Sequence, residues 1–171
     1  MKKFLVILGT VLVVLAGYTV VTVVRPFVLH TELDIDASPE QVWQVLTDRA
    51  TYPEWNPFIT SSTGELKVGD KIVNILRDTK GSETTFDPTL LAVIPNQELR
   101  WIGKVPPGAI FDGEHSFRLT ALPGGRTRLV QEEKFTGAAV PFTRFWLNKS
   151  IKPQFEAMNR ALAARATASV P

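Results

Sequence analysis

The sequence predicts an α+β fold: a curved antiparallel sheet around a long C-terminal helix, preceded by one transmembrane helix. Three observations carry this prediction. An uncharged apolar run opens the chain, residues 58–136 form short alternating segments separated by Gly and Pro turns, and a helical apolar stripe follows Gly137. We assign residues 1–26 to a membrane anchor, 27–166 to one domain and 167–171 to a flexible tail.

The N-terminal run from Phe4 to Val24 carries no charge and is long enough for a helix to cross a bilayer core. The alternative is a cleaved signal peptide, for which Val14-Leu15-Ala16 would provide a small-residue cleavage site. The run continues well past Ala16, which favours an uncleaved single-pass anchor. Lys2 and Lys3 outweigh Arg25 across the membrane, so we expect a cytoplasmic N-terminus and a domain outside.

Composition excludes several classes of function. The chain has 19 basic and 17 acidic residues, but Lys2, Lys3 and Arg25 flank the apolar run, so the remainder is close to neutral. A near-neutral domain does not predict nucleic-acid binding. Because the chain has no cysteine and two histidines, thiolate chemistry is excluded and a multi-histidine metal site is disfavoured. We expect neither a metal nor a cofactor.

Local signals place the first elements of the domain. A strand is expected over Phe27–Asp36, and Ser38-Pro39-Glu40-Gln41 is a capping box that starts a helix ending near Arg49. The proline-rich segment 52–57 is typical of a short helical turn. About six strands should follow before residue 136, with turns at Lys80-Gly81-Ser82, Pro95-Asn96 and Pro123-Gly124-Gly125.

The hairpin around Pro123-Gly124-Gly125 carries the most informative pair of residues. A three-residue loop closed by Leu122 and Arg126 places His115 opposite Glu133, and alternation directs both side chains inward. Such a pair either fixes the hairpin register as a buried hydrogen-bonded contact, or serves as general acid and base or as a polar ligand contact. A two-residue turn would break the pairing.

The C-terminal segment is predicted to be one long helix that starts at Pro141. Phe142, Phe145 and Trp146 form a first apolar stripe, of which Phe145 is expected to pack on the sheet together with Ile151, Phe155 and Met158. A second stripe runs through Ile151, Phe155, Met158 and Leu162. We expect Pro153 to kink the helix between the two stripes, because it cannot donate to the carbonyl of Lys149.

Four segments resemble the SRPBCC (START-like, Bet v 1-like) superfamily, and in particular its polyketide cyclase/dehydrase and lipid transport branch. They are residues 36–43, the Tyr52–Phe58 segment, Gly113-Glu114-His115-Ser116-Phe117 and Glu133–Gly137. The resemblance covers roughly residues 30–165. It implies a helix-grip fold with an apolar cavity under the last helix, and it leaves the activity open because this superfamily contains both carriers and enzymes.

The leading hypothesis is a membrane-anchored protein that binds an apolar small molecule such as a lipid, a quinone or a polyketide-like ring system. The candidate ligand-binding residues are Trp55, Phe58, Trp101, Phe111, His115, Phe117, Glu133, Phe135, Phe145, Phe155 and Met158. One alternative is a cyclase or dehydratase that uses His115 and Glu133. The other is a structural or partner-binding domain at the cell envelope whose interior is filled. Neither the ligand nor the oligomeric state follows from the sequence.

Overall fold

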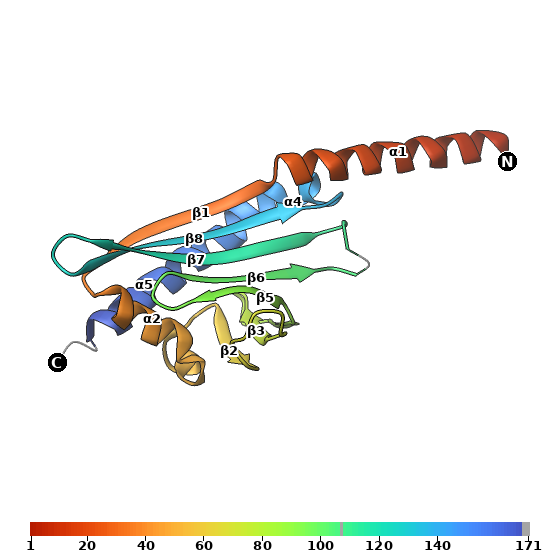
Figure 1. The fold of residues 1–171 in the computed structure, drawn as a ribbon. Coiled ribbons are helices and arrows are strands. Elements are labelled where there is room, and N and C mark those ends of the chain that lie inside the picture. The colour runs from red at the N-terminus through yellow and green to blue at the C-terminus, as the bar shows by residue number, and fades with distance from the viewer. Residues whose placement is uncertain (107, 169–171) are drawn as a thin grey trace.

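The first helix, α1 (Lys2–Val24), extends away from the folded domain, as Figure 1 shows. The computed structural model describes residues 1–106 and 108–168. Residues Lys2–Thr22 have a mean hydropathy of 2.6, and of these only Thr22, at the end next to the domain, is buried. Length and composition therefore suit α1 to cross a membrane. The helix begins two residues before the uncharged run that predicted it.

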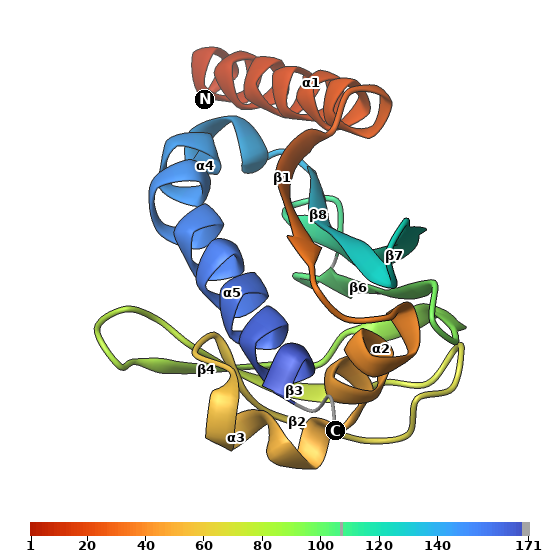
Figure 2. The same cartoon turned by 90° about the vertical axis from the view of Figure 1, so that its left-hand side faces the viewer.

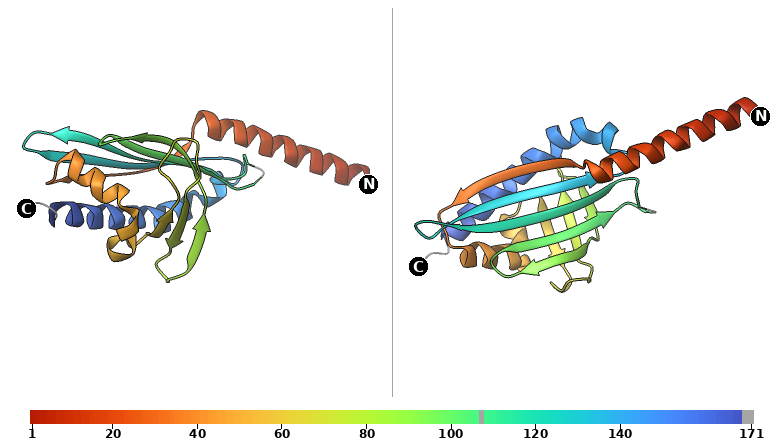
Figure 3. Two further views of the ribbon diagram at one scale, coloured as in Figure 1. Left: turned by 60° about the horizontal axis from the view of Figure 1, so that its bottom comes forward. Right: turned by 45° about the horizontal axis from the view of Figure 1, so that its top comes forward.

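Five antiparallel strands form the main sheet, which Figure 3 shows face-on with α1 continuing beyond it. In spatial order they are β1 (Phe27–Ile35), β8 (Arg126–Thr136), β7 (Asp112–Leu122), β6 (Glu98–Lys104) and β5 (Thr89–Ile94). The β7–β8 hairpin has the predicted register, with Leu122 opposite Arg126 and His115 opposite Glu133. The turn chemistry of Pro123-Gly124-Gly125 thus sets which side chains of both strands face the core.

A second sheet of three strands replaces part of the single meander that the sequence predicted. It comprises β2 (Ile59–Thr63), β3 (Val73–Arg77) and β4 (Glu83–Phe86). The break falls at Asp87-Pro88, where proline has no N–H to continue a ladder. The backbone of Ile72 donates to the carbonyl of Pro88 at 3.0 Å, so β5 begins beside the loop that precedes β3. The two sheets together form a curved wall.

The short helices between β1 and β2 follow their sequence signals. In α2 (Pro39–Thr47) the capping box is complete, because the Ser38 hydroxyl accepts from the Gln41 N–H and the Gln41 side chain accepts from the Ser38 N–H. The helix ends two residues earlier than predicted and passes through a 3-10 turn (Arg49–Thr51) into α3 (Tyr52–Trp55). The Asn56 side chain then accepts from the N–H groups of Phe58 and Ile59, which directs the chain into β2.

The C-terminal helix lies within the curve of the sheets (Figure 2) and is not continuous. It comprises α4 (Val140–Trp146), one π-helical turn (Leu147–Ile151) and α5 (Lys152–Ala168). The π turn stands where the sequence predicted a kink, and it accommodates Pro153, which cannot donate to a preceding carbonyl. Of the tail expected at 167–171, residues 167 and 168 belong to α5, and the others lie outside the described residues.

The outer face of the main sheet contains an ion-pair network around Glu132. Its carboxylate contacts His30 Nδ1 at 2.9 Å and the guanidinium of Arg118. Burial alone would raise the pKa of Glu132, but the hydrogen bonds from His30 and Arg118 outweigh burial and hold that pKa below its ordinary value of 4.5. The ionised carboxylate therefore stabilises the folded chain above this ordinary pKa, and the contribution disappears as the pH falls through the lowered pKa.

We expect Glu132→Gln to lower the free energy of unfolding by about 1 kcal/mol at neutral pH, with a loss that shrinks under acid conditions. Denaturant unfolding of the detergent-solubilised chain at several pH values measures this difference. Glu65→Gln is the matched control, because the Glu65 side chain is exposed to solvent. A loss for Glu132→Gln that stays constant down to low pH would contradict the account.

Candidate functional site

The interior beneath α5 is built around the imidazole of His115, which β7 directs into the core. The ring stacks on Trp101 of β6 with centroids 4.7 Å apart, because the two residues are directly opposite in the sheet register. Phe117 and Phe155 contact its other sides at 4.8 and 4.9 Å. These side chains and Met158 are buried, so the space under the middle of α5 is filled. The sequence predicted a cavity at this position, but the apolar pocket lies beside the His115 cluster instead.

Two polar side chains of β8 contact the nitrogens of His115. Nδ1 lies 3.5 Å from Glu133 Oε2, and Nε2 lies 3.1 Å from the amide nitrogen of Gln131. With the amide assigned as donor, Nε2 is the acceptor and the Nδ1 proton faces the carboxylate. The predicted His115–Glu133 pair is thus present as a contact. Gln131 makes the shorter contact with the imidazole.

Gln131 belongs to a buried polar chain that the sequence analysis missed. The Asn159 amide donates to Thr31 Oγ1 at 2.9 Å, and Thr31 Oγ1 donates to the backbone carbonyl of Gln131 at 3.3 Å. The amide oxygens of Gln131 and Asn159 have no partner among the described residues. A signal for Gln131 existed, since it alternates inward between Leu129 and Glu133. Nothing in the helical stripe singled out Asn159.

An apolar pocket of about 150 Å³ lies beside this cluster, toward the end of the domain where α1 leaves. Its wall joins the β-sheets to the π turn and is lined by Phe58, Leu76, Phe86, Gly103, Val105, Phe111, Gly113, Glu133, Phe135, Trp146, Leu147 and Ile151. Glu133 is the one ionisable side chain among these residues. The pocket therefore offers an apolar surface with a single carboxylate, which reaches back to His115.

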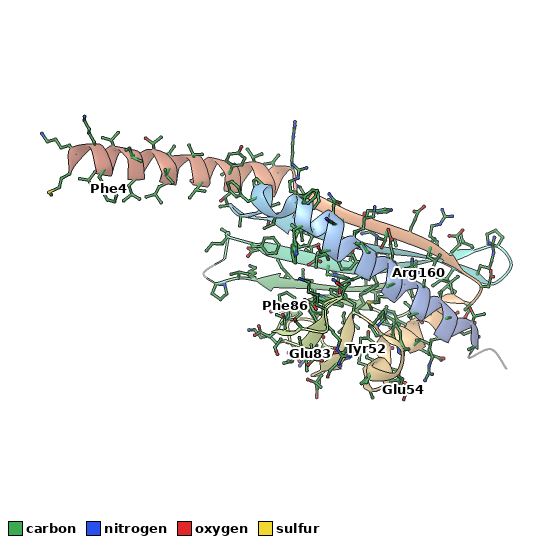
Figure 4. All side chains as sticks on the ribbon, turned by 180° about the vertical axis from the view of Figure 1, so that it is seen from behind. Phe4, Tyr52, Glu54, Glu83, Phe86 and Arg160 are labelled. Atoms are coloured by element: carbon green, nitrogen blue, oxygen red, sulfur yellow. The ribbon has the colours of Figure 1, made fainter. Side chains whose placement is uncertain are left out.

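Two glycines shape the pocket by leaving room for larger side chains. A Cβ at Gly103 would overlap the ring of Phe86, which therefore packs directly on the backbone of β6. A Cβ at Gly113 would lie 2.5 Å from Glu133 Oε1, so Gly113 lets the carboxylate lie against β7. Figure 4 shows Phe86 toward the α1 end of the domain, whereas Arg160 lies farther along α5. Phe86 thus forms the part of the pocket wall that packs on β6.

We expect Gly113→Ala to displace the Glu133 carboxylate and to keep the fold, because the obstructing atom is the end of a flexible side chain. The free energy of unfolding should change by less than about 1 kcal/mol, while the NMR signals of the His115 ring shift. His30, on the outer face, is the internal control and should be unaffected. Unchanged His115 signals would contradict the predicted displacement.

Larger depressions on the surface are less suited to an apolar ligand. One of about 400 Å³ lies between β1 and α5 and is lined by His30, Glu32, Lys152, Glu156 and Arg160 with smaller neighbours. Another of about 490 Å³ is lined by Lys71, Asp87 and Lys104 among others. Charged side chains at these positions remain hydrated, so an apolar molecule gains little from binding there.

The structure separates the predicted ligand-binding residues into three groups. Phe58, Phe111, Glu133 and Phe135 line the apolar pocket, and Trp101, His115, Phe117, Phe155 and Met158 form the packed core behind it. Trp55 lies outside both and packs edge-on against Tyr52 in α3. Phe145 lies on α4, before the π turn, and its ring is exposed to solvent and does not face the sheet. Its predicted packing on the sheet is wrong.

Comparisons with known proteins agree with this architecture. A family model described as polyketide cyclase / dehydrase and lipid transport matches residues 26–167. The chain belongs to this family. The family match covers the whole domain and begins where α1 ends. No curated protein matches the chain.

Several solved structures share the helix-grip fold of this family member. The Zhui aromatase/cyclase from Streptomyces sp. R1128 aligns with a TM-score of 0.68 at 18% identity, over 86% of this chain and 97% of that one. A START superfamily protein from Mycobacterium smegmatis gives 0.63 at 18% identity, over 84% and 99%. The di-domain aromatase/cyclase StfQ of the steffimycin pathway gives 0.67 at 15% identity, over 82% of this chain. The chain spans about half the length of StfQ.

Proposed function

We propose that this chain is a membrane-anchored protein that binds an apolar small molecule in the pocket between the sheets and the π turn. The observation that carries the proposal is the apolar pocket with Glu133 as its one ionisable lining residue. Apolar walls favour a lipid, quinone or polyketide-like ring, and the carboxylate accepts a hydrogen bond from a hydroxyl of that ligand. The family description, which includes lipid transport, supports the same class of ligand.

The size of the pocket limits how such a ligand binds. At about 150 Å³ the pocket is smaller than the roughly 300–1,000 Å³ typical of small-molecule sites, and it holds about one small ring. A larger ligand places one ring inside and leaves the remainder at the mouth, or it displaces Phe86 from Gly103. Trp146 and Val105 line the pocket and are also exposed, so the mouth lies between α4 and the end of β6.

The proposal also includes the anchor. α1 supplies the membrane attachment, and the charge balance of Lys2 and Lys3 against Arg25 favours a cytoplasmic N-terminus with the domain outside. A reporter fused to the C-terminus tests this orientation. A reporter that is active only in the cytoplasm would reverse the assigned side of the membrane.

Equilibrium dialysis of 2-naphthol against the full chain in lipid nanodiscs tests the pocket. Burial of one ring system and a hydrogen bond to Glu133 predict a dissociation constant of roughly 0.1–1 mM. We expect Ile151→Trp, which fills the pocket, to weaken this binding by at least about tenfold, whereas Ile151→Leu conserves volume and should bind normally. Equal binding by the wild type and Ile151→Trp, after empty nanodiscs are subtracted, would contradict the proposal.

A second candidate is an acid–base enzyme of the cyclase or dehydratase type. The favouring observation is the Glu133 carboxylate in the pocket wall with the imidazole of His115 3.5 Å behind it, an arrangement that can hold and move a proton. Three structural neighbours carry the name aromatase/cyclase or its abbreviation. His115 itself does not line the pocket, so Glu133 would contact the substrate. Turnover that survives Glu133→Gln would exclude this role.

A further inference from the structure

The surface of α4 exposes three large aromatic side chains. Phe142 is 80% exposed, Phe145 77% and Trp146 52%. Val105 and Ile110, on either side of the turn between β6 and β7, are exposed as well. We call these five residues the α4 surface. On an ordinary protein surface, exposed apolar side chains are scattered singly. Five large apolar side chains on neighbouring segments, three of them aromatic, therefore indicate an interaction site.

The backbone fixes the α4 surface next to the end of α1. The N–H of Gly137 donates to the hydroxyl of Thr22 in α1 at 2.8 Å. The next two residues, Ala138 and Ala139, donate to the carbonyls of Ala109 and Ile110 at 3.0 and 2.9 Å. Gly137 is required at this junction, because its φ is 118° and a Cβ would lie 2.5 Å from the Ile110 carbonyl oxygen. These hydrogen bonds hold the end of α1, the turn before β7 and the start of α4 together.

The views of the ribbon agree with this connection. α4 lies beside the C-terminal end of α1 in Figures 1 and 2, and the hairpin tip between β7 and β8 lies at the opposite end of the domain in Figure 1. A bilayer that contains α1 therefore comes close to α4 and remains far from the hairpin. Trp residues are enriched at the boundary between lipid and water, where an aromatic ring finds both an apolar and a polar environment.

The charges near the α4 surface suit a bilayer that contains anionic lipids. Residues 138–155 include three basic side chains, Arg144, Lys149 and Lys152, and no acidic one. Arg144 and Lys149 are exposed, and the Lys149 ammonium lies 5.7 Å from the centre of the Phe145 ring. The nearest carboxylate in the turn before β7 belongs to Asp112, which accepts a hydrogen bond from the Ala109 N–H. Aromatic groups flanked by cations, as in residues 138–155, are typical of segments that lie in the headgroup region of a membrane.

From these observations we infer that the α4 surface lies in the interfacial layer of the same bilayer that α1 enters, with the mouth of the pocket facing the lipid. Trp146 and Val105 belong both to this surface and to the pocket lining. A ligand dissolved in the bilayer therefore enters the pocket without crossing water. The inference rests on the proposed membrane anchor and adds how the site exchanges its ligand.

Site-specific labelling tests the inference directly, because the chain has no cysteine and a single introduced one carries the label. The full chain with Phe145→Cys is labelled with the fluorophore NBD and reconstituted into vesicles of phosphatidylcholine and phosphatidylglycerol. Matched vesicles contain lipids with a nitroxide on the acyl chain. Val13→Cys reports on α1, and Ala121→Cys reports on the exposed distal end of β7.

We expect acyl-chain nitroxides to reduce the emission at Phe145→Cys and at Val13→Cys by about twofold or more, and to leave Ala121→Cys nearly unchanged. Quenching at Val13→Cys without quenching at Phe145→Cys would overturn the inference and leave the anchor intact. Absence of quenching at both would overturn the anchor as well. A blue-shifted but unquenched label at Phe145→Cys would show burial against a second copy of the chain, which also overturns the inference.

Discussion

We expect a chain carrying Leu8→Arg and Leu12→Arg to lose the membrane attachment that we propose for α1. Both side chains are exposed on α1, one helical turn apart in the N-terminal half of the apolar run. An arginine costs about 2.5–3.5 kcal/mol of insertion free energy at the centre of a membrane helix and less toward its ends, so the pair costs up to roughly 5–7 kcal/mol. Alkaline extraction of membranes followed by immunoblotting should find the variant in the soluble fraction and the wild type in the pellet.

The control for this experiment is Leu8→Val with Leu12→Val, which keeps the helix apolar and should remain in the membrane. An intact-mass measurement of the pelleted wild type distinguishes an anchor from a cleaved signal peptide, because cleavage after Ala16 would remove most of α1. Retention of the double arginine variant in the pellet would show that α1 is not what holds the chain there.

Replacing Phe155 with alanine is expected to lower the free energy of unfolding by about 3–5 kcal/mol. The ring is fully buried and contacts Phe58 at 5.6 Å and His115 at 4.9 Å, so it joins α5 to the second sheet and to β7. Truncation leaves a void in the packed core beneath α5 that the surrounding strands cannot fill. Denaturant unfolding in detergent, followed by circular dichroism, measures the loss.

Phe145→Ala is the matched control, since this ring belongs to the same C-terminal segment but is exposed. It should change the free energy of unfolding by no more than about 0.5 kcal/mol. Equal losses for the two variants would contradict the assignment of Phe155 to the core and of Phe145 to the surface. Ile151→Trp, in contrast, should affect the pocket more than the core, because Ile151 lines the pocket.

The sequence predicted those parts of the fold that depend on local signals. The capping box at Ser38 and the three-residue turn before Arg126 both act over a few residues, and together they position α2 and fix the register that pairs His115 with Glu133. The split of the sheet at Asp87-Pro88 was missed, because alternation describes each strand and not the neighbour it pairs with. Only the tertiary arrangement decides that pairing.

The candidate site was predicted in part, for a related reason. Apolar periodicity marks a residue as buried or half-buried, but it does not distinguish a pocket wall such as Phe135 from packed core such as Phe155. The helical stripe also predicted that Phe145 packs inward. The π turn changes the direction of the helix between α4 and α5, and the α4 aromatics consequently face outward. The polar chain through Asn159 depends on contacts between α5 and β1 that the sequence alone does not reveal.

Mass spectrometry of the small molecules that co-purify with the full chain tests the central claim most directly. The wild type and Ile151→Leu, purified side by side from the same membranes, should each retain one class of apolar molecule bearing a hydroxyl or similar donor for Glu133. Ile151→Trp should have lost it while keeping the ordinary membrane lipids that surround α1. Identical extracts from all three chains would mean that the pocket holds no ligand, and the binding role would have to be abandoned.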